Sequence, residues 1–159
     1  LWRMALADLL GDAEPGNVVL VARWSEESEE AHGNATTTSP RRALLYFLPS
    51  RELNLPTPTL LVEVGPGDGG VAVTLTSDVL ARAVALSLEP PGPAAPEARM
   101  AAGGRPDHFR DNFFDLLPGE RRTVMVETTR TPEQVRAELR IRTLTEIPEE
   151  GIRLGGGSP

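Results

Sequence analysis

The sequence predicts an all-β protein, an antiparallel β-sandwich of the immunoglobulin or fibronectin type with one or two short helical turns. The first observation is that about six or seven short apolar segments follow residue 60, separated by turn residues at regular spacing. The second is that apolar side chains alternate within these segments. The third is composition, because 15 Gly and 15 Pro in 159 residues favour many turns and argue against a helical bundle.

The first part of the chain contains two predicted strands and a long polar segment. Residues 2–10 are ambiguous between a short helix and a strand, whereas residues 18–24 are dense in Val and typical of a strand. Residues 25–42 are acidic and then rich in Thr without a period, so we expect an exposed loop. Residues 42–48 are apolar with two aromatic side chains and predict a second strand, which Pro49 ends.

A hairpin is predicted next. Apolar side chains occupy alternate positions in residues 60–64 and 71–75, and residues 65–70 between them have the sequence Gly-Pro-Gly-Asp-Gly-Gly, which is typical of a turn. Such strands have one buried and one wetter face, as in antiparallel sheets. Residues 77–78 (Ser-Asp) favour a helix cap and predict a single helical turn over residues 79–82.

Three more segments continue the all-β pattern. Residues 84–88 alternate again and predict a strand, whereas residues 89–106 contain repeated Pro and Gly and predict a flexible loop. Residues 109–117 are the densest apolar stretch of the chain, and the Pro-Gly pair at 118–119 predicts a turn. Residues 124–126 then predict a further strand.

The last part of the chain shows a helix start. Thr131 and Gln134 have the spacing of a capping box, and a Pro stands at the first helical position, so we expect a helix of one or two turns that ends near residue 137. Residues 139–142 alternate apolar and Arg side chains and predict the closing strand. We expect residues 148–159 to be a flexible tail.

Composition excludes several classes of function. The absence of Cys excludes disulfides, thiol catalysis and cysteine metal sites. The net charge of −7, without a visible basic patch, argues against a nucleic-acid partner. No apolar run approaches the roughly 20 residues of a membrane span, so we expect no membrane partner. The chain starts with Leu and not with a signal peptide, so we expect a cytoplasmic protein whose first residue lies inside a longer gene product.

Candidate catalytic and metal-binding residues are few. His108 stands between Asp107 and Asp111, and this arrangement could bind a metal or act as a base, but the simpler interpretation is a loop His beside solvated acids. The sequence places no pair of carboxylates in one cleft, and it contains no Gly-x-Ser-x-Gly motif. We therefore expect no catalytic residue, no metal and no cofactor in this chain.

Residues 110–124 carry a distinctive motif. Their sequence, RDNFFDLLPGERRTV, resembles the signature of the C-terminal immunoglobulin-like domain of β-mannosidases, in family two of the glycoside hydrolases. Residues 45–56, 73–82 and 139–146 are similar to other segments of that domain and occur in the right order, so the resemblance covers roughly residues 42–147. The motif consists of Asp111, Asn112, Phe113, Phe114, Asp115, Leu116, Leu117, Pro118 and Gly119.

The chemistry of this motif favours a structural role. Asp111 and Asn112 can bond nearby backbone amides and fix a turn, and Phe113 or Phe114 can fill the core of the sandwich. Leu116 and Leu117 lead into the Pro-Gly turn. The alternative is a carbohydrate contact made by Phe113, Phe114 or Asn112.

The resemblance implies a domain organisation. Residues 1–48 would be the terminal strands of a preceding β-sandwich domain together with the acidic loop, and residues 49–147 would be the immunoglobulin-like sandwich. The catalytic barrel of the family takes about 250 residues and cannot fit here, so no Glu of this chain inherits a catalytic role. The long Pro-rich loop at 89–106 departs from the family pattern, which puts inherited contacts at this edge in doubt.

The resemblance also implies a function. We expect a non-catalytic structural module of a β-mannosidase-like glycoside hydrolase, whose parent protein hydrolyses terminal β-D-mannosides. Its partners would be the other domains of the parent hydrolase, and exposed N-terminal strands would favour self-association. The alternative is an autonomous carbohydrate-binding module.

Overall fold

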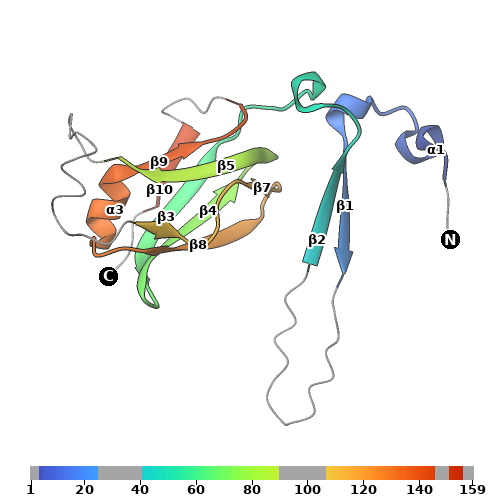
Figure 1. Ribbon diagram of the computed structural model, residues 1–159. Coiled ribbons are helices and arrows are strands. Elements are labelled where there is room, and N and C mark those ends of the chain that lie inside the picture. Colours follow the sequence, from blue (N-terminus) through green and yellow to red (C-terminus); the bar gives the residue numbers. More distant parts are fainter. Residues whose placement is uncertain (1–3, 25–40, 90–106, 146–150, 156–159) are drawn as a thin grey trace, which may run out of the picture. The chain divides into compact units, whose positions relative to one another are not determined.

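The computed structural model describes residues 4–24, 41–89, 107–145 and 151–155 (Figure 1). The chain divides into two compact units, Leu1–Leu55 and Pro56–Pro159. Of the loops predicted at 25–42 and 89–106, residues 25–40 and 90–106 lie outside the described residues. Within the described part of the chain, no helix combines the length and hydropathy that a bilayer span requires.

The first unit is built around a two-stranded ribbon. Strands β1 and β2 pair antiparallel, with Val19 opposite Tyr46 and Trp24 opposite Arg41. Both strands were predicted from the sequence, and the ambiguous segment before them contains a helix. The elements are α1 (Leu6–Leu10), η1 (Pro15–Asn17), β1 (Val19–Trp24), β2 (Arg41–Tyr46) and η2 (Ser50–Glu52).

One face of the ribbon exposes apolar side chains. Leu20 lies opposite Leu45 in the ladder, and these residues are 40% and 54% exposed, while Trp24 on the same face is 44% exposed. A lone two-stranded ribbon is marginally stable in water and needs another layer or further strands to cover it. The first unit therefore has an uncovered apolar face.

The second unit consists of two sheets (Figure 1). The larger has the strand order β10-β3-β4-β8-β6 and the smaller the order β7-β5-β9. All pairs are antiparallel except β10 with β3, which confirms the predicted all-β sandwich. The elements are β3 (Leu60–Gly67), β4 (Gly70–Ser77), β5 (Ala81–Leu88), β6 (His108–Phe109), β7 (Phe114–Leu116), β8 (Arg121–Glu127), α3 (Pro132–Glu138), β9 (Leu139–Arg142) and β10 (Ile152–Leu154).

The core lies between the two sheets because alternate side chains of each strand point inward. Helix α3 adds Val135, which is fully buried, and the Arg136 guanidinium donates a hydrogen bond to the Val64 carbonyl oxygen of β3. The buried apolar cluster is Leu60, Val62, Val64, Val71, Val73, Leu75, Ala81, Val84, Leu86, Leu88, Phe114, Leu116, Val124, Val126, Val135, Leu139 and Ile141.

The predicted β3–β4 hairpin forms with Leu60 opposite Ser77 and Gly67 opposite Gly70. The backbone of β8 passes so close to position 70 that only Gly fits there. A Cβ atom at this position would lie 2.1 Å from the Val126 carbonyl oxygen of β8. The sequence Gly-Asp-Gly-Gly therefore serves two purposes, since it turns the chain and lets β8 pass beside β4.

The helical turn predicted at 79–82 is wrong, because β5 already begins at Ala81. Asp78 does not cap a helix. Its carboxylate accepts a hydrogen bond of 2.8 Å from the Thr59 backbone N–H, and its own N–H donates to the Thr59 carbonyl. The hydrogen bond from Thr59 holds the pKa of Asp78 below its usual range. Asp78 thus joins the end of β4 to the start of β3.

The flexible tail predicted for residues 148–159 also needs correction. Ile152–Leu154 form β10, which pairs in parallel with β3, so that Ile152 lies opposite Leu60. Ile152 packs against the core, and the Gly155 N–H donates to the Val62 carbonyl. Backbone pairing with β3 holds these three residues in the sheet, where β10 is the edge strand.

Candidate functional site

The candidate site is the 111–119 segment, which forms β7 and the turn that leads to β8. The segment buries Phe114, Leu116 and Leu117 and exposes Phe113, Pro118 and Gly119. Phe114 and Leu116 belong to the core cluster, as expected for interior side chains of a sandwich. The polar side chains of the segment contact neighbouring strands.

Asn112 takes the place of a strand residue. Continuing the β5–β7 register, in which Val84 lies opposite Phe114, places Asn112 opposite Leu86. The Asn112 side chain accepts a 2.8 Å hydrogen bond from the Leu86 N–H and donates a 2.9 Å bond to the Leu86 carbonyl. The side-chain amide of Asn112 thus continues the hydrogen-bond ladder with β5 beyond Phe114, where β7 begins. The same oxygen accepts a hydrogen bond from the Phe113 N–H.

Asp115 holds an irregular position of β5. The ladder between β5 and β7 shifts register between Ala81 and Val84, and Ala83 within this interval has φ of +52°. Residues other than Gly rarely adopt this left-handed conformation. The Asp115 carboxylate accepts a 2.7 Å hydrogen bond from the Ala83 N–H. The side chain of one strand therefore satisfies the backbone of a bulge in its neighbour.

Among the described residues, Asp111 bonds a side chain and not the backbone amides expected from the sequence. Its carboxylate binds the guanidinium of Arg122 on β8, with 3.0 Å between Arg122 Nε and Asp111 Oδ2. The Arg122 guanidinium also lies 4.4 Å from the centre of the Phe114 ring. Arg122 thus links the ion pair to a core aromatic side chain. An Arg in an alternating strand gives no signal of either contact, so sequence reasoning missed it.

The turn at the end of the segment has the predicted Pro-Gly chemistry. Leu117 and Glu120 close it with a backbone hydrogen bond of 3.0 Å, and the Glu120 carboxylate accepts a second bond from the Leu117 N–H. Gly119 has φ of +71°, as a type II turn requires at its third residue. The Gly119 N–H donates to the Ser77 carbonyl of β4, which joins the turn to the larger sheet.

Phe113 and Phe114 lie in different environments. The sequence left open whether Phe113 or Phe114 fills the core, and the structure assigns that position to Phe114, which is 8% exposed. Phe113 is 76% exposed and has φ of +58°.

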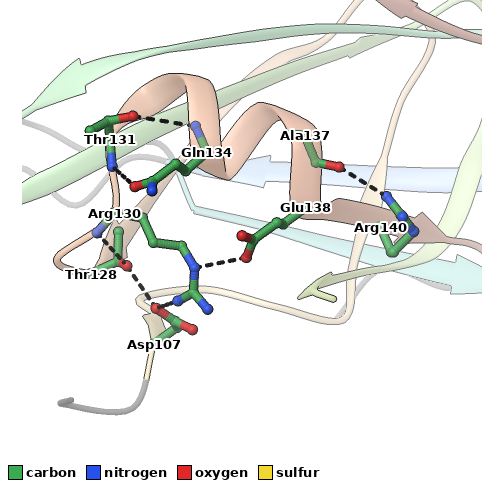
Figure 2. A network of polar contacts seen from close by, with 8 residues as sticks. All are labelled: Asp107, Thr128, Arg130, Thr131, Gln134, Ala137, Glu138 and Arg140. Carbon is green, nitrogen blue, oxygen red and sulfur yellow. Dashed lines mark hydrogen bonds and ion pairs between the residues drawn. The ribbon is translucent and has the colours of Figure 1, made fainter. Parts of the chain in front are cut away.

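A second polar cluster surrounds Arg130, just before α3 (Figure 2). Its guanidinium binds the carboxylates of Asp107 and Glu138, the latter at 2.8 Å, and Thr128 donates a hydrogen bond to Asp107. All three charged side chains are largely buried, with exposures of 15% to 23%. Burial works to lower the pKa of Arg130, but Asp107 and Glu138 outweigh it and raise this pKa above its ordinary value.

The charged groups of both clusters have protein partners. His108 is exposed in β6, and its two acidic neighbours in sequence are engaged elsewhere, Asp107 by Arg130 and Asp111 by Arg122. Among the described residues, no group of three or more His, Asp or Glu side chains could hold a metal ion. What both clusters do is connect strands and helix by charge-assisted hydrogen bonds.

The fold and this segment define the class of the protein, which is an immunoglobulin-like β-sandwich. The Ig_mannosidase family, described as an Ig-fold domain, matches residues 55–147, and the chain belongs to this family.

Among solved structures, the chain is similar to a β-D-mannosidase from Dictyoglomus thermophilum, with 13% sequence identity and a TM-score of 0.54. The match covers 86% of this chain and 19% of that one, so this chain spans about a fifth of the length of the solved mannosidase. No curated protein matches the sequence.

Proposed function

We propose that the chain is a non-catalytic structural module of a β-mannosidase-like glycoside hydrolase. The observation that carries the proposal is the family match over residues 55–147, in which the motif segment directs its polar groups to the protein itself. A group that already binds the backbone or an ion-pair partner is poorly placed to act as a general acid or base, which must reach a substrate. The role of the segment is then to fasten the two sheets to each other.

Residues 1–48 are proposed to be terminal strands of a preceding β-sandwich domain. The exposed apolar face of the β1–β2 ribbon supports this proposal, because a second sheet packed on it would bury Leu20, Trp24 and Leu45. The partners of the chain are accordingly other domains of the parent hydrolase. If that face stays uncovered, it favours self-association.

A carbohydrate-binding module is the alternative, and one observation favours it. The ring of Phe113 is exposed, and aromatic side chains can stack on sugar rings. The neighbouring polar groups weaken this alternative, because the Asn112 amide binds Leu86 and the Asp111 carboxylate binds Arg122. A sugar site needs convergent polar groups around the aromatic platform.

The test compares the 159-residue chain with the natural full-length gene product on nitrophenyl β-D-mannoside. We expect no turnover by the chain alone and hydrolysis by the full-length protein. Turnover by the chain that persists through repurification would contradict a non-catalytic role.

Titration of the chain with manno-oligosaccharides tests the alternative, and millimolar or tighter binding would favour a carbohydrate-binding module. A full-length protein that lacks glycosidase activity would overturn the proposed parent.

A further inference from the structure

Phe113 is the most exposed of the large apolar side chains in the described part of the chain, at 76%. A single exposed apolar side chain is ordinary and needs no explanation. The backbone of Phe113 is less ordinary, because its φ of +58° lies in the left-handed region that bulky residues avoid. Both the exposure of the ring and the conformation of the backbone are therefore unfavourable for this residue in the isolated chain.

The surrounding structure enforces this conformation. Asn112, the preceding residue, is fixed by two hydrogen bonds to Leu86 of β5, and its side-chain oxygen also accepts the Phe113 N–H. Phe114, the following residue, is fixed in the core and in the β5–β7 ladder. Phe113 is thus held at both ends, and strain that the neighbouring structure imposes in this way is typical of functional positions.

The fold does not explain why the residue is Phe. Gly, Asn or Asp would fit a left-handed, solvent-exposed position better, because Gly has no Cβ and the short polar side chains bond locally. A Phe at this position gains nothing from the core of its own unit. A gain from the ring requires apolar surface outside that unit.

We propose that Phe113 is a docking residue that inserts into an apolar socket on another domain of the parent hydrolase, a proposal that rests on the proposed function. A protein partner fits better than a sugar, because the polar groups beside the ring are already paired. Asp111 binds Arg122, and Arg110 binds Glu127 at 2.9 Å, so the two charged residues that precede the apolar ring in the chain are both paired. An aromatic anchor bordered by polar groups is the usual arrangement of an interface centre.

The fixed backbone of Phe113 would also favour binding. A side chain that is already held in one position loses less conformational freedom when it docks than a mobile one does. The strain is then present in the free module and is offset only in the assembled protein. We therefore expect the substitution of Phe113 by Gly to relieve strain in the 159-residue chain and to weaken docking in the full-length protein.

The experiment introduces Phe113→Gly into the 159-residue chain and into the natural full-length protein, with Leu144→Ala as the matched control. Leu144 is another exposed apolar residue, at 49%, outside the motif segment. In the 159-residue chain, Phe113→Gly should leave the midpoint of thermal unfolding unchanged or raise it, because Gly adopts the left-handed conformation without strain. In the full-length protein, hydrogen exchange of residues 111–119 should become about tenfold faster or more, as loss of one buried aromatic anchor predicts. Leu144→Ala should change neither.

The outcomes separate this inference from the proposed function. If the full-length protein hydrolyses β-mannosides but exchange at residues 111–119 is the same in wild type, Phe113→Gly and Leu144→Ala, the docking role is wrong and the proposed function stands. If Phe113→Gly instead abolishes binding of manno-oligosaccharides to the chain, the ring is a sugar contact and the inference is overturned. A full-length protein without glycosidase activity refutes the proposed function and removes the parent hydrolase on which the inference rests.

Discussion

At the scale of single residues, the side chains of the motif act mainly on backbone groups of other strands. Asn112 binds both polar backbone groups of Leu86, and Asp115 binds the N–H of the left-handed Ala83. The turn chemistry of Asn and Asp could be predicted from the sequence. Their partners could not, because Leu86 lies 26 residues from Asn112 and Ala83 lies 32 residues from Asp115. Only the ladder register brings these groups together.

Replacing Asn112 should therefore destabilise the second unit. In Asn112→Ala, the N–H and C=O of Leu86 lose their partners at a half-buried position, and we expect the free energy of unfolding to fall by about 1–3 kcal/mol. Urea unfolding followed by circular dichroism measures this. The control is Asn112→Asp, which keeps the acceptor oxygen but loses the donor to the Leu86 carbonyl. The free energy of unfolding of this variant should also fall measurably. An Asn112→Ala protein with wild-type stability would show that the amide contributes nothing to the ladder.

At the scale of elements, α3 is the clearest case of a helix start that the sequence predicts. The Gln134 N–H donates to Thr131 Oγ1 at 3.3 Å, and the Thr131 N–H donates to Gln134 Oε1 at 2.9 Å, which completes the predicted capping box (Figure 2). Arg130, just before the helix, then binds Glu138, the last residue of the helix. The capping residues are local in sequence, which is why this element was predictable.

Removal of the cap should weaken this helix. Thr131→Ala leaves the Gln134 N–H without its acceptor, and we expect a loss of about 1 kcal/mol in the free energy of unfolding. Thr131→Ser is the matched control, because Ser keeps the hydroxyl and caps as well as Thr, so its stability should stay near that of the wild type. Urea midpoints of the three proteins give the comparison. Equal losses in both variants would mean that the methyl group, and not the hydroxyl, matters.

The elements that sequence analysis misassigned have non-local causes. Residues 77–78 have a capping pattern, yet Asp78 pairs with Thr59 and residues 81–88 form β5 of the smaller sheet. Ile152–Leu154 show too short an alternation to predict a strand, and pairing with β3 organises them. In both cases a tertiary hydrogen-bond partner overrides the local preference. The hairpin β3–β4 was predictable because its pattern and its turn are both local.

At the scale of the whole molecule, the buried apolar cluster belongs to the second unit. Every member of this cluster lies at or after Leu60, whereas the apolar side chains of the first unit include Met4, Leu6 and Leu9, which are all at least 41% exposed. The sequence predicted the sandwich and its core face, because alternation is a property of each strand. It could not predict which of the two adjacent Phe rings is buried, since both belong to the same apolar stretch.

The division into units predicts that residues 56–159 fold without the first unit. Because the core cluster lies in this part, the truncated protein should unfold cooperatively at the same urea concentration as the 159-residue chain. It should also associate less, because it lacks the exposed apolar face that contains Leu20 and Leu45. Analytical ultracentrifugation over a concentration series measures association.

The matched control is Leu45→Glu in the 159-residue chain, which puts a charge on that face and should reduce association without changing the urea midpoint of the second unit. A truncated protein that unfolds without cooperativity would show that the sandwich depends on residues before Pro56, and the proposed organisation into two domains would then be wrong.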